Sequence, residues 1–125
     1  MKELLYLKDD QIKDFIQLLF YAYRETFSDP KEILTKNSFG PAHLRAVNLI
    51  ERNPGTNLGD LMYQLKITKQ SLNRVLRDLL RLKMIKQIKD GEDARRKNLF
   101  LDIEGKIFFD KIYEVQKKRI INALK

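Results

Sequence analysis

The order of apolar and polar positions between residues 68 and 82 predicts an amphipathic helix with two distinct sides. One side is an apolar stripe at helical spacing, made of Leu72, Val75, Leu76, Leu79 and Leu82. The other side carries the side-chain types that hydrogen-bond base edges and phosphates: Lys69, Gln70, Asn73, Arg74 and Arg77. Thr68 stands at the N-cap position. Such a helix suits the DNA major groove, although an arginine-rich surface helix is more often merely solvated.

A shorter helix is expected just before it. Thr56 or Asn57 can cap this helix, and its inward side carries Leu58, Leu61, Met62 and Leu65. Lys66 and Ile67 form the turn into the next helix. Two short helices joined by a turn of about three residues match a helix-turn-helix, which we place at residues 57–82.

Another helix is expected to begin near Pro41, because proline suits the first helical position. It stops at the turn signal of residues 53–55, which read Asn-Pro-Gly. His43, the only histidine, lies near its start. Since it has no second histidine and no cysteine as a partner, we interpret His43 as structural, or at most as a phosphate contact.

After residue 83 the period becomes alternating, and residues 84–103 predict a β-hairpin. In the return strand Leu99, Leu101 and Ile103 share one face. The tip between the strands reads DGEDARRK, and Asp93 and Arg95 can pair to hold its shape. Beside a recognition-type helix this hairpin is a wing whose arginine can enter the minor groove, where the potential is most negative. The alternative is an exposed polar hairpin without a ligand.

Broadly apolar helices are expected at both ends, at residues 9–29 and 103–125. Asp9 or Asp10 can cap the first and Asp102 the second. A helix that is apolar on most sides is either deep core or an oligomer interface. Because a domain of this size has little core to share, we favour an interface between two copies of the chain. The aromatic residues of the first helix, such as Phe15 and Phe20, could instead line a pocket. Residues 31–40 form a connector that has room for a helical turn at 32–34.

The charge is concentrated in one part of the chain. The 125 residues fit a single domain, 1–125, and their formal net charge is +8. Residues 66–97 hold 11 basic and 4 acidic side chains, so this quarter carries nearly all of the excess. A positive charge favours an anionic partner, either nucleic acid or an acidic membrane surface. Its position on the amphipathic helix and the hairpin favours nucleic acid.

Composition also excludes several classes of function. With no cysteine, the chain has no disulfides, thiol redox chemistry or cysteine metal sites. One histidine, no glycine-rich phosphate loop and no convincing carboxylate pair argue against an enzyme, a cofactor or a metal. Charged residues such as Glu3 and Lys8 interrupt any signal peptide, and no apolar run can span a bilayer. We therefore expect a cytoplasmic protein that does not enter membranes.

Taken in order, these elements resemble the MarR family of winged-helix transcriptional regulators over nearly the whole chain. The resemblance rests on residues 58–61 (LGDL), 65–71 (LKITKQS) and 79–85. Its most specific part is Asp93-Ala94-Arg95, similar to the Asp-x-Arg wing motif of the family, followed by residues 101–105 in the place of Leu-Thr-x-x-Gly. It implies a mainly α (α+β) winged helix-turn-helix with a two-stranded wing and a DNA-binding lobe at 41–102, flanked by N- and C-terminal dimerisation helices.

Together, the helix pattern and the resemblance assign DNA contacts to Thr68, Lys69, Gln70, Ser71, Asn73, Arg74, Arg77, Asp93, Arg95, Arg96 and Lys97. By position in the family, Arg95 would enter the minor groove with Asp93 steadying it, and Arg96 and Lys97 would lie near phosphates. Lys83 stands where the family usually has glycine, and a left-handed backbone there would cost a non-glycine residue roughly 1 kcal/mol. The family also usually adds a second C-terminal helix.

We therefore expect a homodimer that binds double-stranded DNA sequence-specifically and regulates transcription. Because members of the family commonly bind palindromic operators and repress transcription, a repressor is the expected role. Many family members release DNA when a small, often phenolic, ligand binds, so a small-molecule effector is possible. Two other functions fit the same fold. One is a non-specific architectural or replication-associated DNA-binding protein, and the other is a winged-helix module that binds an acidic protein.

Overall fold

The computed structural model describes residues 7–28, 35–36, 38–89, 91 and 96–124. It is mostly helical with one two-stranded antiparallel sheet, as the winged-helix expectation requires. The elements, in chain order, are α1 (Asp9–Ser28), α3 (Pro41–Arg52), α4 (Leu58–Leu65), α5 (Lys69–Arg81), β1 (Ile85–Lys89), β2 (Lys97–Leu101) and α6 (Ile103–Leu124).

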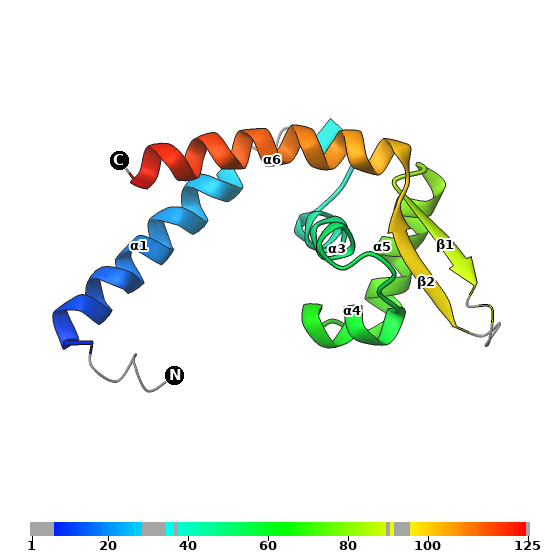
Figure 1. The fold of residues 1–125 in the computed structure, drawn as a ribbon, viewed down its shortest axis with the longest axis horizontal. Helices are drawn as coiled ribbons and strands as arrows, with labels where there is room; N and C mark the ends of the chain where they lie inside the picture. The colour runs from blue at the N-terminus through cyan, green and yellow to red at the C-terminus, as the bar shows by residue number, and fades with distance from the viewer. Residues whose placement is uncertain (1–6, 29–34, 37, 90, 92–95, 125) are drawn as a thin grey trace.

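Figure 1 shows two parts that share the long helix α6. The first half of α6 covers a lobe built from α3, α4, α5 and the hairpin, and its second half packs against α1, which extends away from the lobe. The buried apolar core lies within the lobe and the first half of α6. Its largest fully buried side chains come from six elements: Val47, Ile50, Leu61, Leu72, Leu79, Ile85, Leu99 and Ile112. This core gives the helix-turn-helix and the wing one common support.

Side-chain caps set where two helices, α4 and α5, begin. The Asn57 side chain accepts a hydrogen bond from the Asp60 N–H at 2.9 Å, and Thr68 Oγ1 accepts one from the Ser71 N–H at 3.1 Å. Asp102 Oδ1 accepts one from the Ile103 N–H at 2.8 Å. Asn57, rather than Thr56, is therefore the cap of α4, and the cap expected at Thr68 is confirmed. Asp102 stands directly before α6, but its carboxylate contacts the first helical N–H instead of the second or third, where a capping bond lies.

The cap expected at the first helix is wrong. Helix α1 begins at Asp9, so Asp9 and Asp10 lie in its first turn and no side chain of theirs caps it. The residue before the helix is Lys8, whose N–H donates to Gln11 Oε1 at 2.9 Å. The Gln11 side chain thus forms one half of a capping box, in which the third helical residue accepts a hydrogen bond from the backbone N–H of the residue before the helix. The two carboxylates still suit the positive end of the helix dipole.

Two residues expected on apolar faces are exposed instead, because their elements end earlier than the periodicity suggested. Helix α5 ends at Arg81, so Leu82 leaves the stripe and is 37% exposed. Strand β2 ends at Leu101, so Ile103 is not the third inward residue of the strand but opens α6, where it is 70% exposed. Leu99 and Leu101 are buried as expected.

The chain leaves both helices of the helix-turn-helix through left-handed residues. Lys66, after α4, has φ 53°, and Lys83, after α5, has φ 58°. The expected left-handed backbone at Lys83 is therefore present, and a lysine occupies it. This turn directs the chain from the end of α5 straight into β1, whose register with β2 pairs Ile85 with Leu101 and Lys89 with Lys97.

Helix α1 is not core in a single chain. Phe15, Ile16 and Phe20 are 57%, 60% and 62% exposed, and α1 packs mainly against α6. The deep-core interpretation is therefore wrong for the isolated chain, and a large apolar face remains open. Within the described residues no helix is long and apolar enough to cross a membrane. The helical turn expected at residues 32–34 lies outside the described residues.

Candidate nucleic-acid interface

Helix α5 packs its apolar side against the lobe and exposes its polar side, as its sequence pattern predicts. Leu72, Val75, Leu76 and Leu79 are buried against the lobe. The residues assigned to DNA contact on this helix are all exposed: Thr68, Lys69, Gln70, Ser71, Asn73, Arg74 and Arg77. Because none of them carries core packing, their polar groups are available to a ligand that approaches this face.

The hydroxyl groups at the start of α5 serve the helix itself. Thr68 Oγ1 accepts from the Ser71 N–H and donates to Ser71 Oγ at 3.0 Å. Both hydrogen-bonding roles of the Thr68 hydroxyl are thereby used within the first turn. Thr68 is thus foremost a cap, and the exposed side chains that follow it on α5, such as Gln70, Asn73 and Arg74, are freer to contact bases.

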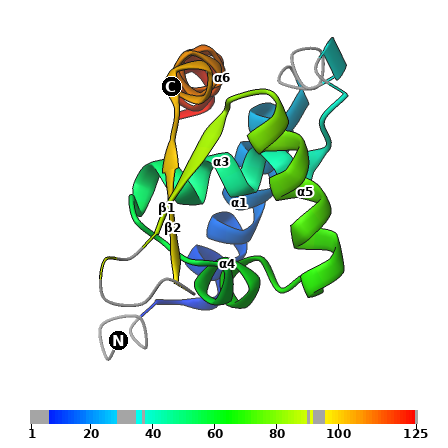
Figure 2. The ribbon, with the colours of Figure 1, turned by 90° about the vertical axis from the view of Figure 1, so that its right-hand side faces the viewer.

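A groove separates α5 from the wing. Its volume is about 700 Å³, and the first residues of α4 are part of its lining. Its lining also includes four residues assigned to DNA contact, namely Asn73 and Arg77 from α5, Arg96 just before β2 and Lys97 at the start of β2. Figure 2 shows α5 and the hairpin on opposite sides of the lobe with α4 below them. The fold thus brings together cations that lie about 20 residues apart.

The groove has a positive potential because three exposed cations, Arg77, Arg96 and Lys97, line it. Leu58 and Gly59, at the amino end of α4, also line it, and the positive end of a helix dipole points there. In a winged helix that binds DNA, the DNA backbone would run through the space between the recognition helix and the wing. Arginine and lysine side chains at such a place bind phosphates.

Sequence reasoning did not assign two residues to this surface, Gln87 and Asn57, which line the groove. Tyr63, on α4, is 83% exposed but is not part of the groove lining. Gln87 shares the inward face of β1 with Ile85, and at the open end of the sheet that face borders the groove instead of the core. In the sequence, this position was marked by a polar residue, Gln87, two positions after the apolar Ile85 on the same face of the strand. Tyr63 stands off the apolar stripe of its helix.

The tip of the wing lies partly outside the described residues. Asp93 and Arg95 are among the residues that the structure does not describe, so their pairing and the insertion of Arg95 remain predictions. Arg96 and Lys97, which follow them, are described and exposed.

A second hollow, of about 440 Å³, lies between the end of α3, the strands of the wing and α6. Its lining combines two cations, two carboxylates and apolar side chains: Glu51, Pro54, Lys86, Phe100, Leu101, Lys106, Phe109 and Asp110. Glu51 Oε2 is buried without a hydrogen-bond partner within the described part of the chain. Such an acceptor is costly to leave unpaired, so it favours the entry of a hydrogen-bond donor.

His43 has a structural setting. It hydrogen-bonds to Gly40 and Asp78, which joins α3 to α5. No group of three histidine, aspartate or glutamate side chains suited to a metal ion occurs among the residues that the structure describes. The interpretation of His43 as structural is therefore supported by its contacts.

Comparison with known proteins places these features in a family. The sequence model of the MarR family matches residues 38–96, which span the helix-turn-helix and the start of the wing. The chain is 38% identical over 117 residues to the HTH-type transcriptional regulator PetP of Rhodobacter capsulatus, covering 94% of this chain and 70% of that protein.

Solved structures share the fold. A MepR mutant from S. aureus bound to an oligodeoxyribonucleotide superposes with a TM-score of 0.71 at 19% identity, covering 88% of this chain and 81% of that one. NadR in complex with 4-hydroxyphenylacetate gives a TM-score of 0.71 at 24% identity, covering 95% and 80%. The extent and level of identity with PetP, the family match and the winged-helix architecture agree: this chain belongs to the MarR family, and it is a sequence-specific DNA-binding transcriptional regulator.

Proposed function

We propose that this regulator is a homodimeric repressor that binds palindromic duplex DNA through α5 and the wing. The observation that carries the proposal is the groove in which Arg77, from α5, faces Arg96 and Lys97, from the wing. A single-sided basic helix could bind any anionic surface. A helix and a hairpin with cations on both sides of a groove fit a DNA backbone running between a major and a minor groove.

The proposal gives different side chains different tasks. Gln70, Asn73 and Arg74 face outward from α5, and their amide and guanidinium groups match adenine and guanine edges in the major groove. Arg77, Arg96 and Lys97 bind phosphates and set the affinity. Lys69 and Ser71 contribute contacts at the start of α5. Arg95, steadied by Asp93, enters the minor groove. Replacing Arg95 with alanine should weaken binding, and equal affinity of the two proteins would remove the wing from the interface.

A second copy of the chain completes the proposed assembly. The open apolar face of α1, with the exposed Tyr113, Ile120 and Ile121 of α6, provides the surface on which the copy would pack. A two-fold arrangement places two recognition helices about one helical turn of DNA apart, which matches a palindromic operator. Residues 9–29 and 103–125 are then the dimerisation helices, and residues 41–102 the DNA-binding lobe of one 1–125 domain. Such a regulator would work in the cytoplasm, beside the chromosome.

We further propose that the hollow beside the wing admits a small aromatic acid that controls DNA binding. NadR has been solved with 4-hydroxyphenylacetate. In this chain, Phe100 and Phe109 could enclose a ring, Lys86 and Lys106 could hold a carboxylate, and the unpaired Glu51 Oε2 could accept from a hydroxyl. A ligand there would touch both the wing and α6. Titration of the protein–DNA complex with 4-hydroxyphenylacetate tests this, and release of DNA is the expected result.

The experiment that tests the main proposal is selection of duplexes from a random library, followed by fluorescence anisotropy of the selected duplex and a scrambled duplex across a salt series. We expect a palindromic winner that binds at least about a thousandfold more tightly than the scrambled duplex. The logarithm of its affinity should fall linearly with the logarithm of salt concentration, with a slope that counts phosphate contacts.

The other functions predict different results. Equal binding of both duplexes with the same salt dependence would favour the architectural DNA-binding protein. No binding to either duplex at low salt would point to an acidic protein as the partner of the basic surface. For the repressor role itself, the selected duplex placed upstream of a reporter should give lower transcription when the protein is present.

A further inference from the structure

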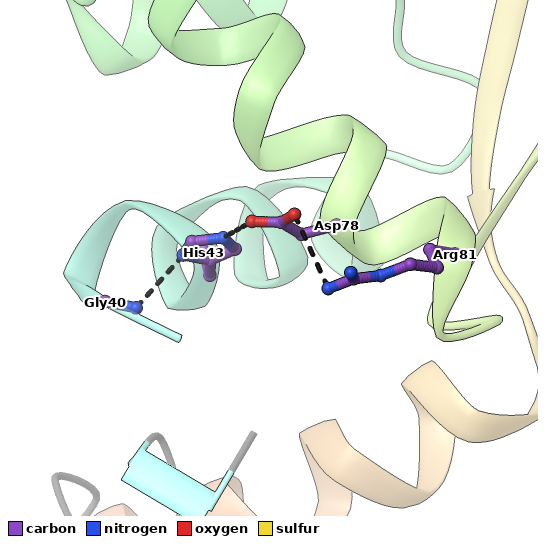
Figure 3. Close-up of polar contacts among 4 residues, drawn as sticks. All are labelled: Gly40, His43, Asp78 and Arg81. Atoms are coloured by element: carbon purple, nitrogen blue, oxygen red, sulfur yellow. Dashed lines mark hydrogen bonds and ion pairs between the residues drawn. The ribbon is translucent and has the colours of Figure 1, made fainter. Parts of the chain in front are cut away.

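His43 makes two directional contacts, one with the N-cap residue of its own helix α3 and one with α5 (Figure 3). Its Nδ1 accepts a hydrogen bond from the Gly40 N–H at 3.0 Å, and its Nε2 lies 2.9 Å from Asp78 Oδ2. Asp78 belongs to α5, 35 residues further along the chain, and its Oδ1 lies 3.7 Å from Arg81 Nη2. The imidazole is thus a bridge between two helices that apolar side chains otherwise hold together.

The contacts determine which ring nitrogen carries the proton. Because the Gly40 N–H is a donor, Nδ1 must offer its lone pair. Nε2 then carries the hydrogen and donates it to the Asp78 carboxylate. In its contact with Gly40, His43 takes the part that glutamate or glutamine plays at the third position of a capping box. The ring therefore has one tautomer in which both nitrogens are satisfied.

Aromatic packing holds the ring in that orientation. Phe39 stacks on His43 with ring centroids 4.6 Å apart and an interplanar angle of 13°. Phe39 in turn meets Phe108, from α6, edge to face, with centroids 5.6 Å apart. Both phenylalanines are buried. The imidazole is therefore aimed at Asp78 by the cap on one side and by the stack on its face.

The position of Asp78 on α5 gives this bridge a consequence for DNA reading. Asp78 follows Arg77, which lines the groove, and stands one turn after Arg74, whose side chain is exposed. The inner side of α5 is held by leucine and valine side chains, whose apolar contacts are not directional and tolerate small rotations and shifts. A hydrogen bond to a carboxylate is directional and short, so it selects one setting of the helix.

We propose that His43 is a positioning residue for DNA recognition, which holds α5 through Asp78 in the rotation that presents Asn73 and Arg74 to the base edges of duplex DNA. This inference rests on the proposed DNA-binding role of α5. The His43 and Asp78 side chains are 13% and 30% exposed, so water can partly replace the bond when it is lost. Loss of the bond should therefore impair recognition more than folding.

The first test compares variants on the duplex selected by the wild-type protein. His43→Leu should bind that duplex about tenfold more weakly, the size of coupling expected between contacting residues, and should bind scrambled DNA as before. His43→Gln should restore affinity, because its amide oxygen can accept from Gly40 and its NH₂ can donate to Asp78. Asn48→Leu is the matched control, since Asn48 is an exposed polar residue of the same helix, and it should bind like the wild type.

A double-mutant cycle with Asp78→Ala identifies the partner. His43→Leu should have no further effect on specific binding once Asp78 is alanine. Additive losses, an unchanged affinity of His43→Leu, a parallel loss on scrambled DNA, or a His43→Gln protein as weak as His43→Leu would each overturn the proposal. If the wild type selects no duplex at all, the proposed function fails first, which is a separate outcome.

A second measurement needs no variant. His43 is the only histidine in the chain, so a long-range ¹H–¹⁵N spectrum of the imidazole reports on this ring alone. In alkaline buffer we expect the shifts of one fixed tautomer with the hydrogen on Nε2. A spectrum of the Nδ1–H tautomer, or averaged shifts of a freely exchanging ring, would contradict the bridge even if every variant failed to fold.

Discussion

Single residues in this protein matter most where the backbone itself comes close or turns sharply. Gly105 is the clearest case, because α6 passes close to Met84, directly before the start of β1, at this residue. A Cβ atom there would overlap the carbonyl oxygen of Met84 and lie 2.8 Å from its carbon. That oxygen also accepts from the Asp102 N–H at 2.9 Å, so it cannot move away freely. The glycine of the family pattern therefore has a steric reason here.

Gly105→Ala should lower the free energy of unfolding by about 2–3 kcal/mol, because the helix or Met84 must shift to admit the methyl group. Urea denaturation at one fixed protein concentration measures it as a lower midpoint with an unchanged slope. Gly59→Ala is the matched control. Its Cβ would meet only Asn57 Oδ1, at 3.4 Å, so stability should stay equal or rise by up to about 1 kcal/mol. Equal stability of the two variants would refute the close approach.

The left-handed Lys83 supplies the opposite prediction. Its φ of 58° is strained for a residue with a Cβ, so Lys83→Gly should raise the free energy of unfolding by about 1 kcal/mol. Lys86→Gly removes the same charge from an exposed position of β1 and should instead lower stability by about 0.5–1 kcal/mol. Thermal melts of both variants distinguish a backbone effect from a charge effect, and a loss at both positions would contradict the strain argument.

At the scale of the element, α5 divides its work by the direction of its side chains. Its apolar side fixes it to the lobe, its forward side carries Asn73 and Arg74, and Arg77 turns toward the groove that the wing closes. Base contacts specify a sequence, while phosphate contacts supply affinity that depends on salt. Two substitutions on one helix should therefore have different signatures.

Asn73→Ala should relax preference at one position of the operator by about 1–3 kcal/mol and leave the salt slope unchanged. Arg77→Ala should weaken binding to all duplexes alike and reduce that slope by about one. Anisotropy across a salt series, on the selected duplex and on single-base variants of it, measures both quantities. If Arg77→Ala changed preference while the salt slope stayed the same, the assignment of this arginine to phosphate would be wrong.

At the scale of the whole molecule, the open question is what covers α1. The exposed face of this helix runs along most of its length and is far larger than a scatter of single apolar residues, and a soluble monomer rarely leaves such a patch exposed. The shape in Figure 1, with α1 extending away from the lobe of α3, α4, α5 and the hairpin, fits the proposed interface at one end and the proposed DNA-binding surface at the other.

Ile16→Glu should convert the proposed dimer to a monomer, because a carboxylate would be buried in an apolar interface. Gln17→Glu is the control, since it adds the same charge to the neighbouring residue, whose side chain is already polar and lies about 100° around α1 from Ile16. Sedimentation or light scattering across a concentration series measures the mass. A dimeric Ile16→Glu protein would place the dimer interface elsewhere.

Much of the local structure follows from residues close together in the chain. The side-chain caps at Asn57 and Thr68 and the turn after Arg52 depend on contacts within about four positions. The polar side of α5 is visible in the periodicity of its own residues. The glycine of the family pattern marked position 83 as one where a left-handed backbone would be costly to lysine, and the structure has that backbone there. The concentration of basic charge within residues 66–97 is a property of the sequence itself and needs no fold.

Other features depend on residues far apart, and only the tertiary structure decided them. Periodicity extended α5 to Leu82 and the strand to Ile103, but packing ended each element one or two residues earlier. The groove required β2 to lie opposite α5, and the bond between His43 and Asp78 required α3 to cross that helix. A pattern along the chain records which side of an element is apolar. It does not record which element lies on that side, because burial depends on the arrangement of the whole core.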